Sequence, residues 1–94
     1  MKYCDICGIP FKIIYAAGSL GGVNFGECCA MKSEITINSD CSDDQKSATL
    51  VHEWMHGVAG CNGVDDSEEL VSIVSTELYR QGFRVATYEK DDAV

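Results

Sequence analysis

The sequence predicts a small α+β domain, in which a three-stranded mixed sheet packs on two helices. Residues 9–15, 23–29 and 34–38 have the composition of strands, whereas residues 43–60 and 67–81 carry helical spacing of apolar side chains. The connections between these segments are short enough for one domain. We therefore expect a single domain over residues 1–94, near the lower end for an independent hydrophobic core, with an acidic tail that frays from about residue 89.

Each predicted strand has a feature that limits where it can lie. Pro10 stands at the start of the first strand, where a missing backbone N–H is tolerated. A turn-rich loop at residues 18–22 leads to the second strand, in which Gly26 suggests a bulge or a close backbone approach. Ile35 and Ile37 in the third strand fall on one face, so we expect that face to be buried.

The first helix begins after Ser42, because Ser42 and Gln45 form a capping-box pattern. It ends at Gly60 and the turn at residues 62–63, since Asn-Gly is a strong turn signal. Its apolar residues recur at helical spacing, which predicts one buried face formed by Ala48, Val51, Met55 and Val58.

The second helix begins near Ser67 and is ended by Gly82. Asp66 and Glu69 fit a second capping box, which gives Glu69 a structural role at the helix start. Residues 83–88 are expected to form a short extended piece. The stripe expected to pack against the first helix consists of Glu68, Val71, Val74 or Ser75, and Leu78.

The most informative motif is His-Glu-x-x-His, formed by His52, Glu53 and His56, which include the chain's only two histidines. Positions i and i+4 share one face of a helix, so both imidazoles can reach a single Zn²⁺ while Glu53 approaches the attacking water. The alternative is an ordinary buried helix with hydrogen-bonded histidines. The predicted helix around the motif favours a zinc site with one ion per chain.

A catalytic zinc usually has three protein ligands and one open position. The metzincin pattern does not supply the third ligand, because Ala59 replaces its glycine and Asn62 replaces its third histidine. Two adjacent carboxylates on the second helix, Glu68 and Glu69, are the candidates. Helical phase favours Glu68, which shares the inward stripe.

The helix from Glu68 (Glu-x-x-Val-Ser-x-Val-Ser-x-Glu-Leu) resembles the Glu-x-x-Ala-Asn-x-Phe-Ala-x-Glu-Leu helix of gluzincins, especially the small bacterial and phage metallopeptidases of the repressor-cleaving (ImmA/IrrE) type. Residues 34–38 and 49–56 resemble the same group, so the likeness covers about two thirds of the chain. Val71 and Ser72 depart from the family's small residue and amide. The resemblance implies a minimal gluzincin whose strand at residues 23–29 is the sheet edge along which the substrate lies.

We therefore expect a zinc-dependent metallopeptidase that acts on a peptide or protein substrate, with His52, His56 and Glu68 as metal ligands and Glu53 as the general base. One rival is a non-catalytic regulatory or binding protein whose metal only braces two helices; a second is a metal-dependent hydrolase of a non-peptide bond. No histidine remains to stabilise an oxyanion. Tyr79 lies too far along its helix from Glu68 for this role, and the sequence does not rank Tyr15, Tyr88, Arg80 and Arg84.

Charge and hydropathy narrow the partners. The net charge is −8 and the seven basic residues are scattered, so there is no basic stripe for nucleic acid. No apolar stretch approaches the roughly 20 residues that span a bilayer, and no secretory signal follows Met1. We expect a cytoplasmic protein, and the family resemblance implies a bacterial or phage-infected cell. The sequence leaves the oligomeric state open.

The chain contains six cysteines, which we expect to be reduced. Cys4 and Cys7 form half of a zinc-knuckle pattern, but the second half is missing, because Cys28 and Cys29 are a vicinal pair. We interpret Cys4 and Cys7 as thiols without a shared ligand role; a second metal site is the alternative.

Overall fold

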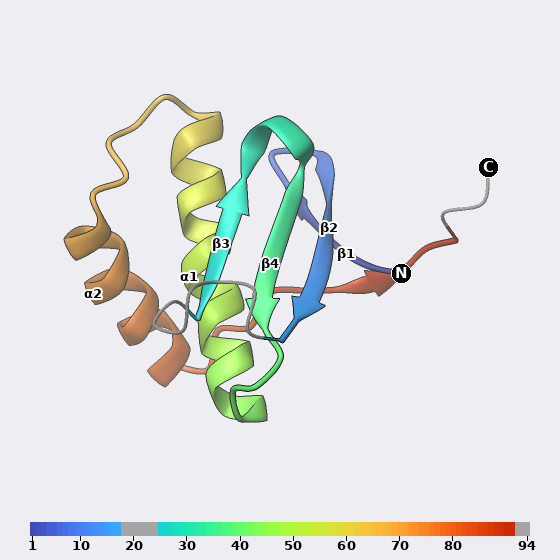
Figure 1. The fold of residues 1–94 in the computed structure, drawn as a ribbon. Helices are drawn as coiled ribbons and strands as arrows, with labels where there is room; N and C mark the ends of the chain where they lie inside the picture. The colour runs from blue at the N-terminus through green and yellow to red at the C-terminus, as the bar shows by residue number, and fades with distance from the viewer. Residues whose placement is uncertain (18–24, 92–94) are drawn as a thin grey trace.

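The computed structural model describes residues 1–17 and 25–91, and Figure 1 shows their arrangement. The predicted loop at residues 18–22 and the first two residues of the predicted second strand lie outside this range. The other predicted strands and both predicted helices are confirmed, with ends that agree to within one residue. The elements are β1 (Lys2–Ile6), β2 (Ile9–Ala16), β3 (Gly26–Cys29), the 3-10 helix η1 (Ala30–Lys32), β4 (Glu34–Asn38), α1 (Asp43–Cys61), α2 (Glu68–Arg80) and β5 (Tyr88–Glu89).

The strands of the described residues form one sheet with the order β3-β4-β2-β1-β5. β2 and β4 pair in parallel, whereas the other neighbours are antiparallel, so the predicted mixed α+β architecture is confirmed. The predicted number of strands is wrong: the sheet has five strands rather than three, because β1 and β5 extend it beyond β2.

The alternation in β1 is visible in the sequence only when Cys4 is counted as an apolar residue. Cys4 and Ile6 are buried on one face, while Asp5 between them is exposed. Cys7 and Gly8 then form a two-residue hairpin turn, with left-handed φ angles of 53° and 81°. The segment is therefore a strand followed by a turn. β5 is exposed and only two residues long, which leaves no pattern to read.

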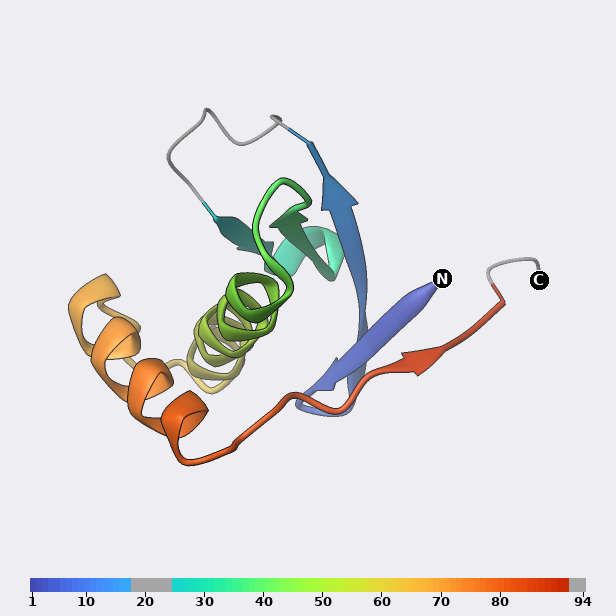
Figure 2. The same ribbon diagram turned by 90° about the horizontal axis from the view of Figure 1, so that it is seen from below.

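α1 lies between the sheet and α2, so the domain has three layers (Figure 2). Ile35 and Ile37 share a buried face, as predicted. Of the four apolar residues predicted to form the buried face of α1, only Val51 is fully buried. The observed buried face is rotated slightly about the helix axis from the predicted one, so that Leu50 and Gly57 also face inward. The core cluster consists of Cys4, Ile6, Phe11, Ile13, Ile35, Ile37 and Leu50.

Two glycines allow α1 and the sheet to approach closely. A Cβ on Gly26 would lie 2.7 Å from Cγ2 of Thr49 and 2.9 Å from the carbonyl oxygen of Thr36, so the close approach predicted at this glycine is confirmed. A Cβ on Gly57 would lie 2.6 Å from Cδ1 of Ile6. Side chains at either position would push the helix away from the sheet.

The first of the two predicted helix caps is confirmed and the second is wrong. The Ser42 side chain accepts a hydrogen bond from the Gln45 amide at 3.2 Å. α2 is capped by Ser67, whose side chain accepts from the Leu70 amide at 3.3 Å, and not by Asp66. The Asp66 carboxylate contacts a histidine instead.

The C-terminal strand reaches back to the start of the chain. Glu89 pairs with Lys2, and the Lys90 amide donates to the Met1 carbonyl at 2.9 Å. Pairing therefore continues two residues into the segment that we expected to fray, and residues 92–94 lie outside the described range. Neither described helix combines the length and the apolar character that a membrane crossing requires.

Gly57→Ala should destabilise the protein by about 1 to 3 kcal/mol, because the added methyl group overlaps the buried Ile6 side chain. Gly60→Ala is the matched control on the same helix: a Cβ there meets nothing within 4 Å, so stability should stay level or rise by up to about 1 kcal/mol. Urea unfolding followed by circular dichroism measures both. Equal stability of the two variants would contradict the close packing of α1 on β1.

Candidate metal centre

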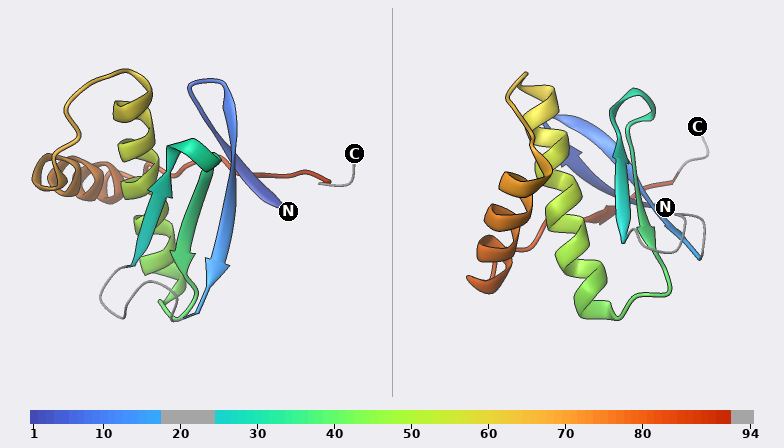
Figure 3. Two further views of the ribbon diagram at one scale, coloured as in Figure 1. Left: turned by 45° about the horizontal axis from the view of Figure 1, so that its top comes forward. Right: turned by 60° about the vertical axis from the view of Figure 1, so that its left-hand side comes forward.

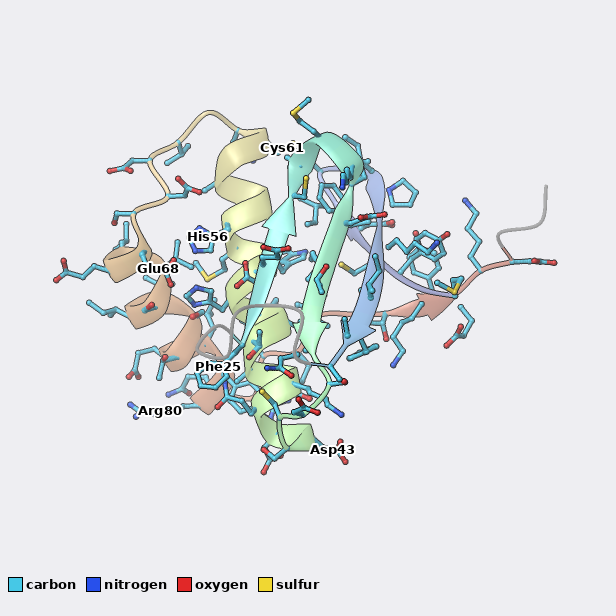
Figure 4. The ribbon with its side chains drawn as sticks, viewed as in Figure 1. Phe25, Asp43, His56, Cys61, Glu68 and Arg80 are labelled. Atoms are coloured by element: carbon cyan, nitrogen blue, oxygen red, sulfur yellow. The ribbon has the colours of Figure 1, made fainter. Side chains whose placement is uncertain are left out.

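Three side chains from two helices meet between α1 and α2: His52 and His56 from α1, and Glu68 from the first turn of α2 (Figure 4). The two carboxylate oxygens of Glu68 lie 2.8 Å from the two Nε2 atoms, one oxygen to each ring. The two Nε2 atoms lie 3.2 Å apart. The three side chains thus direct their potential metal-ligand atoms toward one point.

These three residues form a group that could hold a metal ion, since one ligand atom from each lies within 4.8 Å of the others. Ligand atoms in a tetrahedral site with bonds of about 2.1 Å are about 3.4 Å apart, close to the separations seen here. Glu69, the competing candidate, is exposed and is not part of the group. The structure therefore brings together the three predicted ligands.

Helical phase explains the convergence. His52 and His56 are one turn apart on α1 and present their rings to α2. On α2, the buried residues Val71 and Ser75 fix which face turns toward α1, and Glu68 lies on that face one turn before Val71. In the predicted stripe, Ser75 rather than Val74 is the buried member.

The Nδ1 atom of each imidazole also has a neighbour, and neither contact is predicted by the sequence. Nδ1 of His56 lies 3.2 Å from a carboxylate oxygen of Asp66, and Nδ1 of His52 lies 3.4 Å from Oγ of Ser75. The Ser75 hydroxyl donates to the Ser72 carbonyl, which leaves its oxygen free to accept from His52. A proton held at Nδ1 leaves the Nε2 lone pair available to a metal ion.

The contact between Asp66 and His56 was not predicted, because Asp66 precedes a helix and a carboxylate at such a position usually caps the helix. Ser75 was visible as an inward position, but its polar role depends on the partner helix. Both contacts require α1 and α2 to be placed together, which no local pattern describes.

The ionisable groups around the histidines shift one another's pKa values. Burial would lower the pKa of His56, but hydrogen bonds to Asp66 and Glu68 outweigh it and raise the pKa above its ordinary value. Burial opposes ionisation of Glu68, yet the neighbouring His52 and His56 rings lower the pKa of this carboxyl. The site thus favours an ionised Glu68 and a protonated His56.

Glu53 lies one residue along α1 and faces the sheet side of the same cleft. Its side chain is buried, with 8% of the residue exposed. Burial is the main cause that raises its pKa to about 7; the carboxylates of Glu68 and Glu27 add to the effect, and His56 opposes it. A carboxyl group near neutrality can both accept and release a proton.

A cleft of about 510 Å³ runs from the ligand cluster along α2. β3 borders it through Gly26 and is an edge strand of the sheet, as the sequence analysis expected for residues 23–29. Figure 4 shows Phe25 and Arg80 toward the end of the cleft away from His56. The lining residues are Phe25, Gly26, Gln45, Ala48, Thr49, His52, Glu53, Glu68, Ser72, Ser75, Thr76, Tyr79 and Arg80.

The unranked oxyanion candidates are now placed. Tyr15 and Arg84 line a different cleft, and Tyr88 donates to Asp5 at 2.6 Å. Arg80 lines the cleft beside the ligands but pairs with Glu77 at 2.9 Å. Tyr79 also lines this cleft, and its hydroxyl donates to the Asp44 carbonyl at 3.3 Å.

Within residues 1–17 and 25–91, no second group of three metal-ligating side chains is present. Cys4 is fully buried, and burial raises its thiol pKa to about 11, so it stays protonated near neutrality. Cys7 is exposed in the hairpin turn. Cys4 and Cys7 therefore differ in exposure, and their interpretation as thiols without a shared ligand role stays a prediction.

Known proteins add nothing to this picture: no protein-family model, no curated protein and no solved structure matches the chain. The resemblance to gluzincins therefore rests on the sequence motifs alone.

The three ligands predict a definite pattern of metal content. After incubation with divalent metal ions and gel filtration, the unmodified chain should retain one ion, whereas His56→Ala and Glu68→Ala should retain none. Glu69→Ala is the matched control and should keep its ion, because this carboxylate is not part of the ligand group. Elemental analysis counts and identifies the ion. Loss in Glu69→Ala with retention in Glu68→Ala would move the third ligand by one residue.

Asp66→Asn should weaken metal affinity by about 10- to 100-fold, because the amide no longer holds a proton on Nδ1 of His56 as strongly. Asp65→Asn removes the same charge from the neighbouring exposed residue and should leave affinity nearly unchanged. Competition with a chromogenic chelator gives both constants. An equal loss in the two variants would mean that only overall charge matters.

Proposed function

We propose that this chain is a zinc-dependent metallopeptidase that hydrolyses a peptide bond in a peptide or protein substrate. The observation that carries the proposal is the convergence of His52, His56 and Glu68, with the buried carboxyl of Glu53 opening onto the same cleft. A general base and, beside it, a group of three metal ligands from two helices are the two parts that such a hydrolysis needs.

The donor set fits zinc. Two imidazole nitrogens and one carboxylate oxygen are a common protein ligand set of catalytic zinc, which keeps its remaining position open. When bound, zinc would polarise the scissile carbonyl and lower the pKa of a bound water toward about 7. His52, His56 and Glu68 would hold the ion, and Ser75 and Asp66 would orient the rings.

Glu53 supplies the proton chemistry in this proposal. Its carboxylate accepts a proton from the attacking water and delivers it to the leaving amine, so that one group serves both halves of the reaction. The close contact of Gly26 with α1 covers Glu53 and limits its exposure to bulk solvent. Burial keeps the carboxyl oriented toward the cleft.

β3 offers a way to position an extended substrate. It lies at the end of the sheet and pairs with β4 on one side only among the described strands. An extended peptide can add to such an edge through main-chain hydrogen bonds, which read little sequence. Gly26 has no side chain to obstruct the cleft at this point. As part of the same proposal, we place the enzyme in the cytoplasm of a bacterial or phage-infected cell.

The second candidate is a regulatory or binding protein in which the metal only braces the helices. It is favoured by the light packing of α2, which buries only Val71 and Ser75. The ligands would be the same in both functions. They differ in Glu53, which a purely structural metal does not need.

Glu53→Gln should abolish peptide hydrolysis, with a loss of about 10²- to 10⁴-fold, while the metal content stays at the level of the unmodified chain. Glu27→Gln, an exposed carboxylate on β3 close enough to influence Glu53, is the control and should keep most of the activity. Mass spectrometry of a peptide library measures the products. Unchanged turnover in metal-loaded Glu53→Gln would refute the base, and a metal-loaded chain that cuts no peptide would favour the bracing function.

A further inference from the structure

A second meeting point of reactive side chains lies away from the metal centre, where the β1–β2 hairpin turn reaches the C-terminal end of α1. Both views of Figure 3 show this turn beside the end of the helix. Cys7 occupies the turn and Cys61 is the last residue of α1. Neither residue is a metal ligand or a lining residue of the cleft.

The fold brings the Cys7 sulfur to the end of α1, against the residue that follows Cys61. The Asn62 side-chain amide donates to Sγ of Cys7 at 3.4 Å and to the Val58 carbonyl at 2.8 Å, which holds the Cys7 sulfur against the end of α1. Cys61 directly precedes Asn62 in the chain, and the neighbouring Cys7 thiol raises the pKa of the Cys61 thiol. Both cysteines are exposed, and Figure 4 shows Cys61 at the outer end of the helix.

The conformation of Cys7 supports a role for its sulfur. With φ of 53°, Cys7 takes a left-handed conformation that Gly, Asn and Asp adopt more easily in a two-residue hairpin turn. Turn chemistry therefore does not account for a cysteine here. A pairing with the nearby Cys61 would account for it.

Cys4 and Cys28 are less accessible than this pair. Burial raises the pKa of both Cys4 and Cys28 to about 11, so these thiols remain protonated and are shielded from reagents in solution. Cys28 is half-buried and Cys4 is fully buried. Exposure and position thus single out the pair at the end of α1.

We propose that Cys7 and Cys61 form a reversible disulfide that ties the β1–β2 turn to the C-terminal end of α1. The oxidant is a low-molecular-weight disulfide, such as oxidised glutathione. One cysteine, as thiolate, attacks the small disulfide and displaces one thiolate, which takes up a proton. The second cysteine then attacks the mixed disulfide, so two protein thiols become one disulfide and two small thiols are released.

The tie would join the sheet to the helix that carries both histidines. It would close a long loop, from the first hairpin to the end of α1, and so stabilise the fold mainly by restricting the unfolded chain. The segment after Cys61 leads to Asp66, which contacts His56, so the bond would also anchor the start of this connection. The inference does not depend on peptidase activity.

The test equilibrates the full chain over a series of reduced-to-oxidised glutathione ratios, followed by acid quenching, alkylation and peptide mapping. We expect one internal bond between Cys7 and Cys61, and a melting temperature higher by on the order of 10 °C in the oxidised chain. Dithiothreitol should return both readouts to their starting values. Hydrolysis of peptides is not part of either readout.

Cys7→Asn is the key variant, because asparagine suits the left-handed turn and the variant should fold. It should lose the bond and the rise in melting temperature. Cys41→Ser, at a half-buried cysteine outside the pair, should retain both. Stable glutathione adducts at Cys7, a bond between other cysteines, or free alkylation of Cys7 and Cys61 at every ratio would each overturn the proposal.

Discussion

α1 packs against the sheet on one side and against α2 on the other, and the arrangement of the site depends on this double packing. Its inner face is fixed by Val51, which is fully buried, and by Gly57, where a methyl group would already collide with Ile6. With that face fixed, His52 and His56 can only emerge toward α2. Close packing therefore sets the direction of the ligands as firmly as any contact within the site itself.

Local signals in the sequence predicted much of this structure, and the failures share one cause. The cap at Ser42, the close approach at Gly26 and the choice of Glu68 over Glu69 each follow from spacing within a few residues. By contrast, β5 exists only because the C-terminal segment reaches β1, and the Asp66 contact exists only because two helices lie together. A single sequence carries little trace of such pairings over long distances.

The electrostatics of the site give a physical reason for a cation. The carboxylates of Asp66 and Glu68 lie against the two imidazoles, so negative charge gathers between the helices. A proton on His56 relieves part of this repulsion. A metal ion at Nε2 would relieve more, and the two compete for the same lone pair, which couples metal binding to proton release.

α2 is the least anchored layer of the domain. It buries only Val71 and Ser75, and the residues that connect it to α1 are exposed throughout. Glu68 lies in the first turn of α2. An ion bound by this carboxylate and the two imidazoles would therefore contribute much of the free energy that keeps α2 packed on α1. Local opening of α2 and departure of the ion would then be one equilibrium. The residence time of the metal would then depend on how often this short helix opens, and not only on the chemistry of the ligands.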